Sequence, residues 1–164
     1  MLNISQSLIN IKNDLLAQSW VSLSGSGLTQ FQAGYTSENY SNAAGSPFFC
    51  ISDPTSQSQM GTNMAEDFIH IFKIHCCVKW EVSQPNAINN QDFLETQKEE
   101  GMLRIREIWD NLKPYVVKNT TMDKWFGNRT YFMQDFSFAE NDIDVLKVLR
   151  RTITIKMLDV VSKV

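Results

Sequence analysis

The residues best suited to metal binding or nucleophilic catalysis are two histidines and three cysteines, namely His70, His75, Cys50, Cys76 and Cys77. Imidazole and thiolate groups bind zinc when four of them converge on one point. A thiol beside an imidazole can also act as a nucleophile with its base. Four of the five residues lie within eight positions of one another, so the structure of that stretch decides which chemistry is open to them.

The stretch that must position these side chains, residues 68–82, reads FIHIFKIHCCVKWEV. Its apolar residues alternate, which predicts a half-buried β-strand. Such a strand places His70 with Cys76 on one face and His75 with Cys77 on the other. We therefore expect no metal site and no cofactor here. No nucleophile motif surrounds Cys50, so a core or interface role is expected for these residues.

The expected strand is also unusually long. Strands commonly have about 5–6 residues, and at about 3.3 Å per residue this one would span about 45–50 Å. We expect it to extend past its own core and to offer its end to a neighbouring chain. Its second face, from Lys73 through His75 and Lys79 to Glu81, is expected to meet a neighbouring subunit or solvent.

Length and composition limit the classes of function. The chain has 164 residues, 43% of them hydrophobic, and a formal net charge of −3. We expect one domain spanning 1–164. The charge argues against a general nucleic-acid-binding surface. No apolar run is long enough for a membrane span, and the first residues do not resemble a signal peptide. The odd number of cysteines favours free thiols in a reducing compartment.

The other segments predict an α+β fold, a mainly antiparallel sheet packed against two principal helices. The expected order is helix, two strands, helix, two strands. Helical spacing predicts a first helix near 4–16 and a second from 92 to about 112, ended by Pro114. A long polar loop is expected at 25–46, and it carries Tyr35 and Tyr40. Gly101, inside the second helix, is expected to mark a close packing contact.

Three further groups of residues have a plain structural interpretation. The acidic residues of the second helix alternate with basic ones, as on a solvated face. Glu140, Asp142 and Asp144 are too few and too poorly spaced for a calcium loop. Arg150 and Arg151 could bind a phosphate, but charges at a strand edge or subunit contact explain them better.

The arrangement of these segments resembles the tail terminator, or tail-to-head joining, proteins of long-tailed bacteriophages. The resemblance rests on the opening helix, the strand that ends at residues 51–54 (ISDP), the long strand, the helix FLETQKEEGMLRIREIWDNL and the final strand RRTITIKML. It covers most of the chain and depends on element order and local character.

The resemblance implies a structural virion protein without a catalytic centre. Six copies would form a ring at the head-proximal end of the tail, assembled in the host cytoplasm. The ring would cap the tail tube, stop its polymerisation and meet the neck or connector protein, and in some tails the sheath protein. DNA would pass through the lumen without specific binding, and no membrane is involved. We expect the subunit and partner contacts at Lys73, His75, Lys79, Glu81, Tyr35, Tyr40, Arg150 and Arg151.

Three other functions remain open at this point. The first is a neck or tail-completion protein beside the connector. The second is a small thiol hydrolase that uses Cys50 and a histidine. The third is a nucleic-acid-binding module that uses Arg150, Arg151 and the C-terminal aromatic residues.

Overall fold

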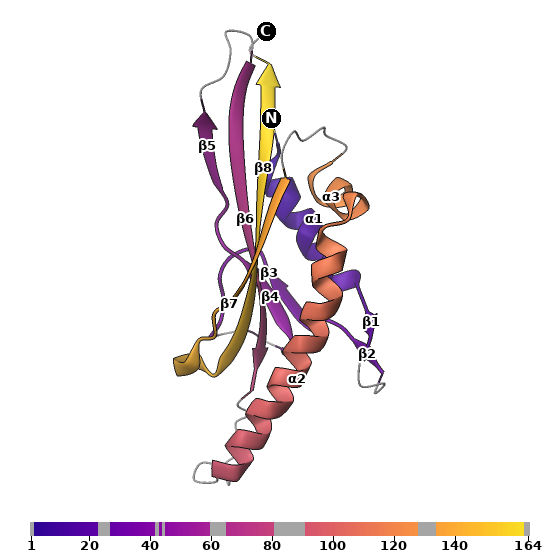
Figure 1. Ribbon diagram of the computed structural model, residues 1–164, viewed down its shortest axis with the longest axis vertical. Coiled ribbons are helices and arrows are strands. Elements are labelled where there is room, and N and C mark those ends of the chain that lie inside the picture. Colours follow the sequence, from indigo (N-terminus) through magenta and orange to yellow (C-terminus); the bar gives the residue numbers. More distant parts are fainter. Residues whose placement is uncertain are drawn as a thin grey trace.

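In the computed structural model the chain has the α+β class expected from its sequence, with three helices and a mixed sheet. The structure describes residues 2–22, 27–41, 43, 45–59, 65–80, 91–127 and 134–162. The elements, shown in Figure 1, are α1 (Ile4–Ala17), β1 (Trp20–Val21), β2 (Leu28–Thr29), β3 (Ala33–Tyr35), β4 (Phe48–Ile51), β5 (Thr55–Gln59), β6 (Ala65–Lys79), α2 (Gln91–Val116), α3 (Asn119–Phe126), β7 (Gln134–Glu140), η1 (Asp144–Leu146) and β8 (Val148–Ser162).

The long strand β6 is confirmed and begins and ends three residues earlier than expected. It pairs antiparallel with β8 along its whole length, from Ala65 opposite Ser162 to Lys79 opposite Val148. The six-stranded sheet has the order β3-β4-β6-β8-β7, and β5 pairs with the first part of β6. All of its pairs are antiparallel except β3 with β4. Glu81, an expected contact residue, lies outside the described residues.

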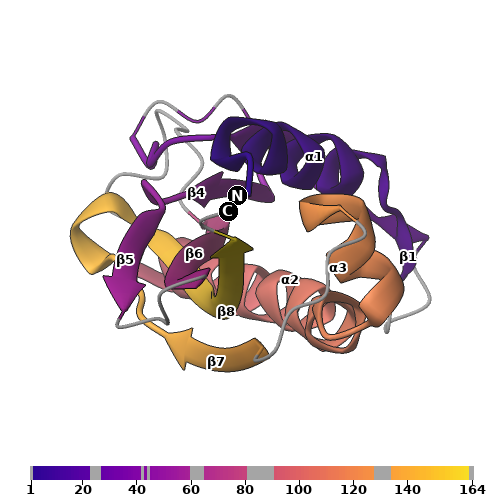
Figure 2. The same cartoon turned by 90° about the horizontal axis from the view of Figure 1, so that it is seen from above.

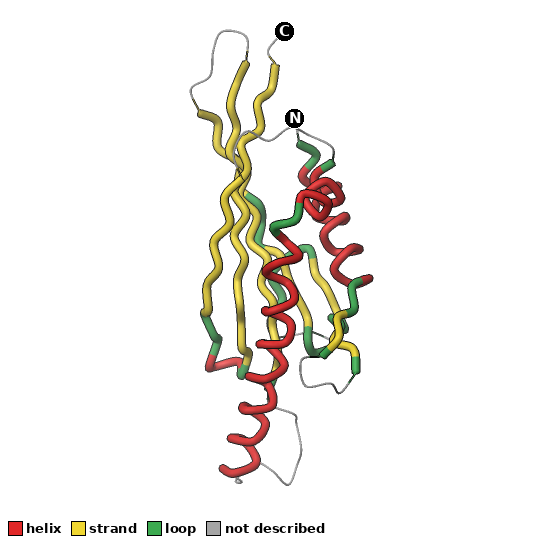
Figure 3. The backbone as a smooth tube through the Cα atoms, turned by 45° about the vertical axis from the view of Figure 1, so that its right-hand side comes forward, coloured by secondary structure: helices red, strands yellow, loops and turns green. Residues whose placement is uncertain are grey.

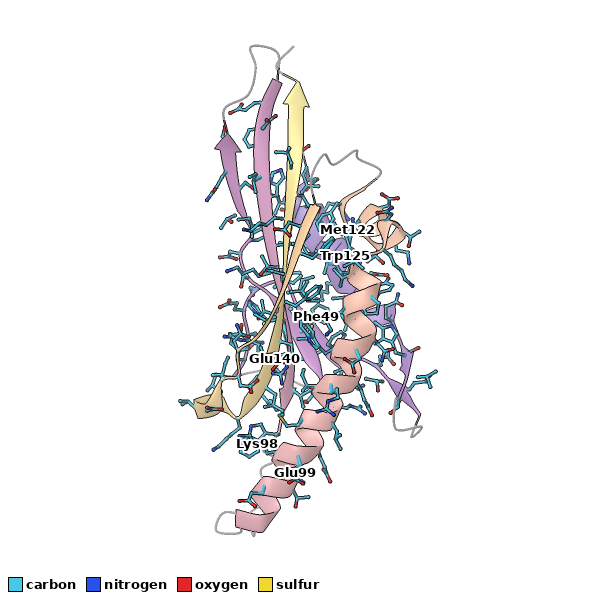
Figure 4. The ribbon with its side chains drawn as sticks, in the orientation of Figure 1. Phe49, Lys98, Glu99, Met122, Trp125 and Glu140 are labelled. Carbon is cyan, nitrogen blue, oxygen red and sulfur yellow. The ribbon has the colours of Figure 1, made fainter. Side chains whose placement is uncertain are left out.

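Helices α1, α2 and α3 cover one face of this sheet (Figure 2), which we call the inner face. The main core lies between them and the inner-facing residues of β4, β6 and β8. Phe49, Met122 and Trp125, labelled in Figure 4, belong to this core. The opposite, outer face carries a second, smaller core around Phe48, Cys77 and Val148.

Local features of the sequence explain how α1 begins and how closely α2 packs. Asn3 caps α1, since its side chain accepts a hydrogen bond from the backbone N–H of Gln6 at 3.1 Å. Gly101 allows α2 to approach the sheet, because a Cβ there would lie 2.9 Å from Cβ of Trp80 and 3.3 Å from Leu149.

Helix α3 occupies a region to which no element was assigned from the sequence. Three expectations about the elements were wrong. Pro114 lies inside α2 rather than ending it. The polar stretch that begins at Thr55 forms strand β5. An edge strand whose side chains are exposed to water on both faces needs no alternation of apolar residues. The segment 25–46, expected to be a polar loop, contains β2 and β3.

One end of the sheet extends beyond the helices. Figures 1 and 3 show β5, the start of β6 and the end of β8 projecting together past α1 and α3. We call this part, residues 55–59, 65–71 and 156–162, the arm. Its three strands are held by the pairing of β6 with both neighbours. The expectation that the long strand would project past its core therefore matches the observed shape.

Candidate functional site

The outer face of the sheet is divided into an exposed half and a covered half. Lys73 is exposed on it, and His75, two residues further along β6, is only 5% exposed. The covering groups come from the chain itself. The ring of Tyr40 lies 6.1 Å from that of His75, and Glu38 lies 3.4 Å from His75 Nε2. The expectation that His75 would face solvent or another subunit was wrong, because residues of the segment 25–46 fold over it.

A hydrogen-bonded network connects this covering segment to the sheet. His75 Nε2 lies 2.6 Å from the Ser52 hydroxyl, which donates to Glu38 at 2.6 Å. On the other side of the ring, Nδ1 lies 2.8 Å from Thr152 Oγ1, and Thr152 donates to Asn141 Oδ1. Both ring nitrogens thus have hydroxyl partners inside the protein.

Arg150 and Tyr40 complete the outer-face network. Arg150 donates through Nη1 to the Tyr40 hydroxyl at 3.0 Å and through Nε to Asn141 Oδ1 at 3.1 Å. Its guanidinium carbon also lies 5.2 Å from the centre of the Tyr40 ring. Lys79 donates through Nζ to the backbone oxygen of Ser41 at 3.0 Å. These expected contact residues therefore meet parts of their own chain.

The cysteines are free and fully buried. A hydrogen bond from Cys77, assisted by the backbone of Asn39 and the Tyr40 hydroxyl, lowers the pKa of Cys50 to about 7 against the opposing effect of burial. Burial raises the pKa of Cys76 and of Cys77. A nucleophile must reach its substrate, and Cys50 has no exposed surface. This geometry gives no support to a thiol hydrolase.

Acidification is expected to destabilise the fold through His75. Burial, followed by the charge of Arg150, lowers the His75 pKa to about 4, although Glu38 opposes this shift. An unfolded histidine has a pKa of about 6.5, so between these values the unfolded chain binds a proton that the folded chain does not. The free energy of unfolding that the neutral His75 contributes is complete above pH 6.5. It decreases as the pH falls, by about 2 kcal/mol at pH 5. Urea unfolding at pH 7 and pH 5 measures it.

His75→Gln is the matched control for this prediction, because glutamine keeps hydrogen-bonding groups but does not titrate. The variant is expected to lose about 2 kcal/mol less than the wild type between pH 7 and pH 5. Equal losses in both proteins would show that His75 does not cause the pH dependence.

A second polar network lies on the inner face at the base of the arm. His70 is 1% exposed. Its Nδ1 lies 2.7 Å from the Ser56 hydroxyl and its Nε2 lies 3.2 Å from Asp159 Oδ2. Asp159 also accepts from the backbone N–H of Leu2 at 3.0 Å. The network links β5, β6 and β8 to the start of α1.

Hydroxyl, imidazole and carboxylate in this order form the arrangement that activates a serine nucleophile. Buried polar groups in a sheet need the same partners for a structural reason. Ser56, His70 and Asp159 sit on three adjacent strands, and neither of the two cavities described in this section contains them. Their position fits a cross-link at the base of the arm. The signal in the sequence was the polar residues His70 and Asp159 within the mainly apolar inner rows of β6 and β8.

Arg151 lies on the inner face and is 6% exposed. Its Nη1 lies 2.6 Å from Asp142 Oδ1 and its Nε lies 3.6 Å from Glu140. Arg150 and Arg151 therefore point to opposite faces, as alternation predicted, and they do not form a joint phosphate site. Tyr35 packs edge-on against Phe48 in the outer core.

Among the cavities formed by the described residues, two lie near the expected contact residues. A groove of about 300 Å³ between α2, the end of β7 and the start of β8 is lined by Met102, Ile105, Arg106, Trp109, Asp110, Lys113, Glu140 and Arg151. A shallower depression of about 460 Å³, lined by Ser37, Glu38 and Asp53, lies beside the outer-face network. Sequence reasoning did not find the groove, since its two walls come from distant segments.

Comparisons with known proteins identify no relative: no protein family model matches this chain, and no curated protein has a matching sequence. Within the described residues, no helix is long and apolar enough to cross a membrane. The same residues include no group of three or more His, Cys, Asp or Glu side chains placed to hold a metal ion. The arm and the groove are the two surface features that the described residues offer as candidates for the site.

Proposed function

We propose that this protein is a structural virion subunit that forms a ring at the head-proximal end of a bacteriophage tail. The ring would cap the tail tube, end its polymerisation and contact the neck or connector protein. The observation that carries the proposal is the arm. A paired, three-stranded extension beyond the helices adds little to the core of its own chain, whereas a neighbouring subunit can cover it.

The fold supports this proposal at the level of element order. The larger elements α1, β4, β6, α2, β7 and β8 follow one another as helix, two strands, helix, two strands, the order on which the proposed resemblance rests. Strands β1, β2, β3 and β5 and helix α3 lie between them. The first turns of α2 extend past the opposite end of the sheet from the arm (Figure 3), so both ends of the subunit offer contact surfaces.

The charge of the chain is compatible with a lumen that passes DNA. A formal net charge of −3 gives weak repulsion of phosphates. In the proposed ring the basic side chains Arg150 and Arg151 are engaged within the subunit, with Tyr40 and with Asp142. This pairing disfavours their use as a phosphate clamp.

Electron microscopy of tails labelled with an antibody against this chain tests the proposal. We expect label at the head-proximal end of the tail and six-fold rings in images of the purified protein. Label at the connector itself would favour the neck or tail-completion function, and absence of label from tails would refute the virion function.

A further inference from the structure

The floor of the groove between α2 and β7 consists of three apolar residues, Met102, Ile105 and Trp109. Met102 is 40% exposed, whereas Ile105 and Trp109 are buried. Phe138 of β7, which is 42% exposed, extends this apolar surface and lies edge-on to Trp109 at 5.7 Å. Apolar surface gathered in a groove marks an interaction site more often than single exposed residues do.

The rim of the groove is mainly cationic. Arg106 and Lys113 line it on α2, one on each side of Asp110. Lys113 Nζ lies 5.4 Å from the centre of the Trp109 ring, so its charge is held over the floor. Arg151 is neutralised by Glu140 and Asp142. Among the described residues Arg106 has no ion pair, which leaves its charge for a partner.

The outer face of the arm carries the complementary surface. Alternate residues of β6 place Asp67, Ile69 and Ile71 in one row, and Leu158 of β8 lies opposite Ile69. All four are half-buried in the single chain. The row therefore has an acidic end followed by an apolar patch.

The two surfaces also agree in size. The four residue steps of strand from Asp67 to Ile71 span about 13 Å. The seven residue steps of helix from Met102 to Trp109 span about 10 Å. An apolar row with a terminal carboxylate thus fits a groove with an apolar floor and a cationic rim.

We infer that the groove of one copy receives the arm of a second copy, with Asp67 of the arm beside Arg106 and Lys113 of the groove. The arm and the groove are different surfaces of one chain, so the contact is heterologous. Repeated contacts of this kind close into a ring when the rotation closes. The inference rests on the proposed ring and names the surfaces that build it.

Charge exchange across the contact tests the inference. Asp67→Lys and Arg106→Glu are each expected to raise the protein concentration needed for half-assembly at least about tenfold, because each places like charges together. The double variant restores the ion pair with the two charges exchanged. Its concentration for half-assembly is expected to lie within about threefold of the wild-type value. Sedimentation velocity over a range of concentrations measures these values.

Arg104→Glu is the matched control, since it makes the same charge change on the same helix outside the groove. It is expected to assemble like the wild type, and thermal unfolding shows whether each variant folds. If the wild type forms a ring and the double variant fails to recover, the arm-to-groove contact is wrong and the ring stands. If the wild type is a monomer, both the contact and the proposed ring are wrong.

Discussion

Gly34→Ala is expected to destabilise the protein by at least about 3 kcal/mol, because a methyl group at this position meets a buried ring. An ideal Cβ at Gly34 would lie 2.2 Å from Cζ of Phe49. Phe49 is fully buried, and its ring packs edge-on against Phe31 with 5.0 Å between centres. The ring therefore cannot move without displacing a second aromatic residue. Urea unfolding of the variant measures the loss.

Phe49→Leu provides the matched background for this prediction, because leucine leaves space where the ring was. Leucine itself costs stability through lost packing. In that background Gly34→Ala is expected to cost at least about 1.5 kcal/mol less than in the wild type, which a double-mutant cycle detects. An equal cost in both backgrounds would contradict the proposed clash.

Asp14→Leu is expected to cost about 3–5 kcal/mol, since it leaves two donors of the helical layer without their acceptor. Asp14 Oδ2 accepts from the Tyr115 hydroxyl at 2.6 Å and from Trp125 Nε1 at 2.8 Å. Trp125 is fully buried, and burial together with the Asp14 bond raises the pKa of Tyr115. One carboxylate thus joins α1, α2 and α3.

Asp14→Asn is the control for this substitution because it keeps an acceptor oxygen of the same shape. It is expected to lose only about 1–2 kcal/mol, since both donors bond to the one oxygen Oδ2, which the amide oxygen can replace as a neutral acceptor. Guanidinium unfolding of both variants compares them. Equal stability of Asp14→Leu and the wild type would show that these hydrogen bonds contribute little.

The features that the sequence predicted well depend on local signals. The strand β6 follows from alternation among residues close together in the chain. The close packing of Gly101 against Trp80 was predictable, because glycine destabilises a helix interior unless a close contact requires it there.

The features that it missed depend on contacts between distant segments. Nothing in the sequence of α1 indicates that α3 supplies Asp14 with a buried indole N–H. Helix α3 has only eight residues and begins with an asparagine and two threonines, so its helical signal is weak. The covering of His75 by Tyr40 and Glu38 pairs residues more than thirty positions apart, which periodicity cannot reveal.

Among the expected contact residues, only Lys73 is both described and exposed on the outer face. His75 and Arg151 are buried, and Lys79 and Arg150 are bonded to their own chain. The surfaces that now carry the proposed assembly, the arm and the α2 groove, lie elsewhere on the chain. The length of the strand thus correctly predicted a projecting element. Its residues that were expected to be accessible, however, are mostly covered by their own chain.

Native mass spectrometry of the purified wild-type chain tests the central claim, ring formation, most directly. A ring of six copies of the 18.8 kDa chain is the expected species, and it should dissociate only at low concentration. A chain that stays monomeric at every concentration, with or without tail components, would contradict the claim.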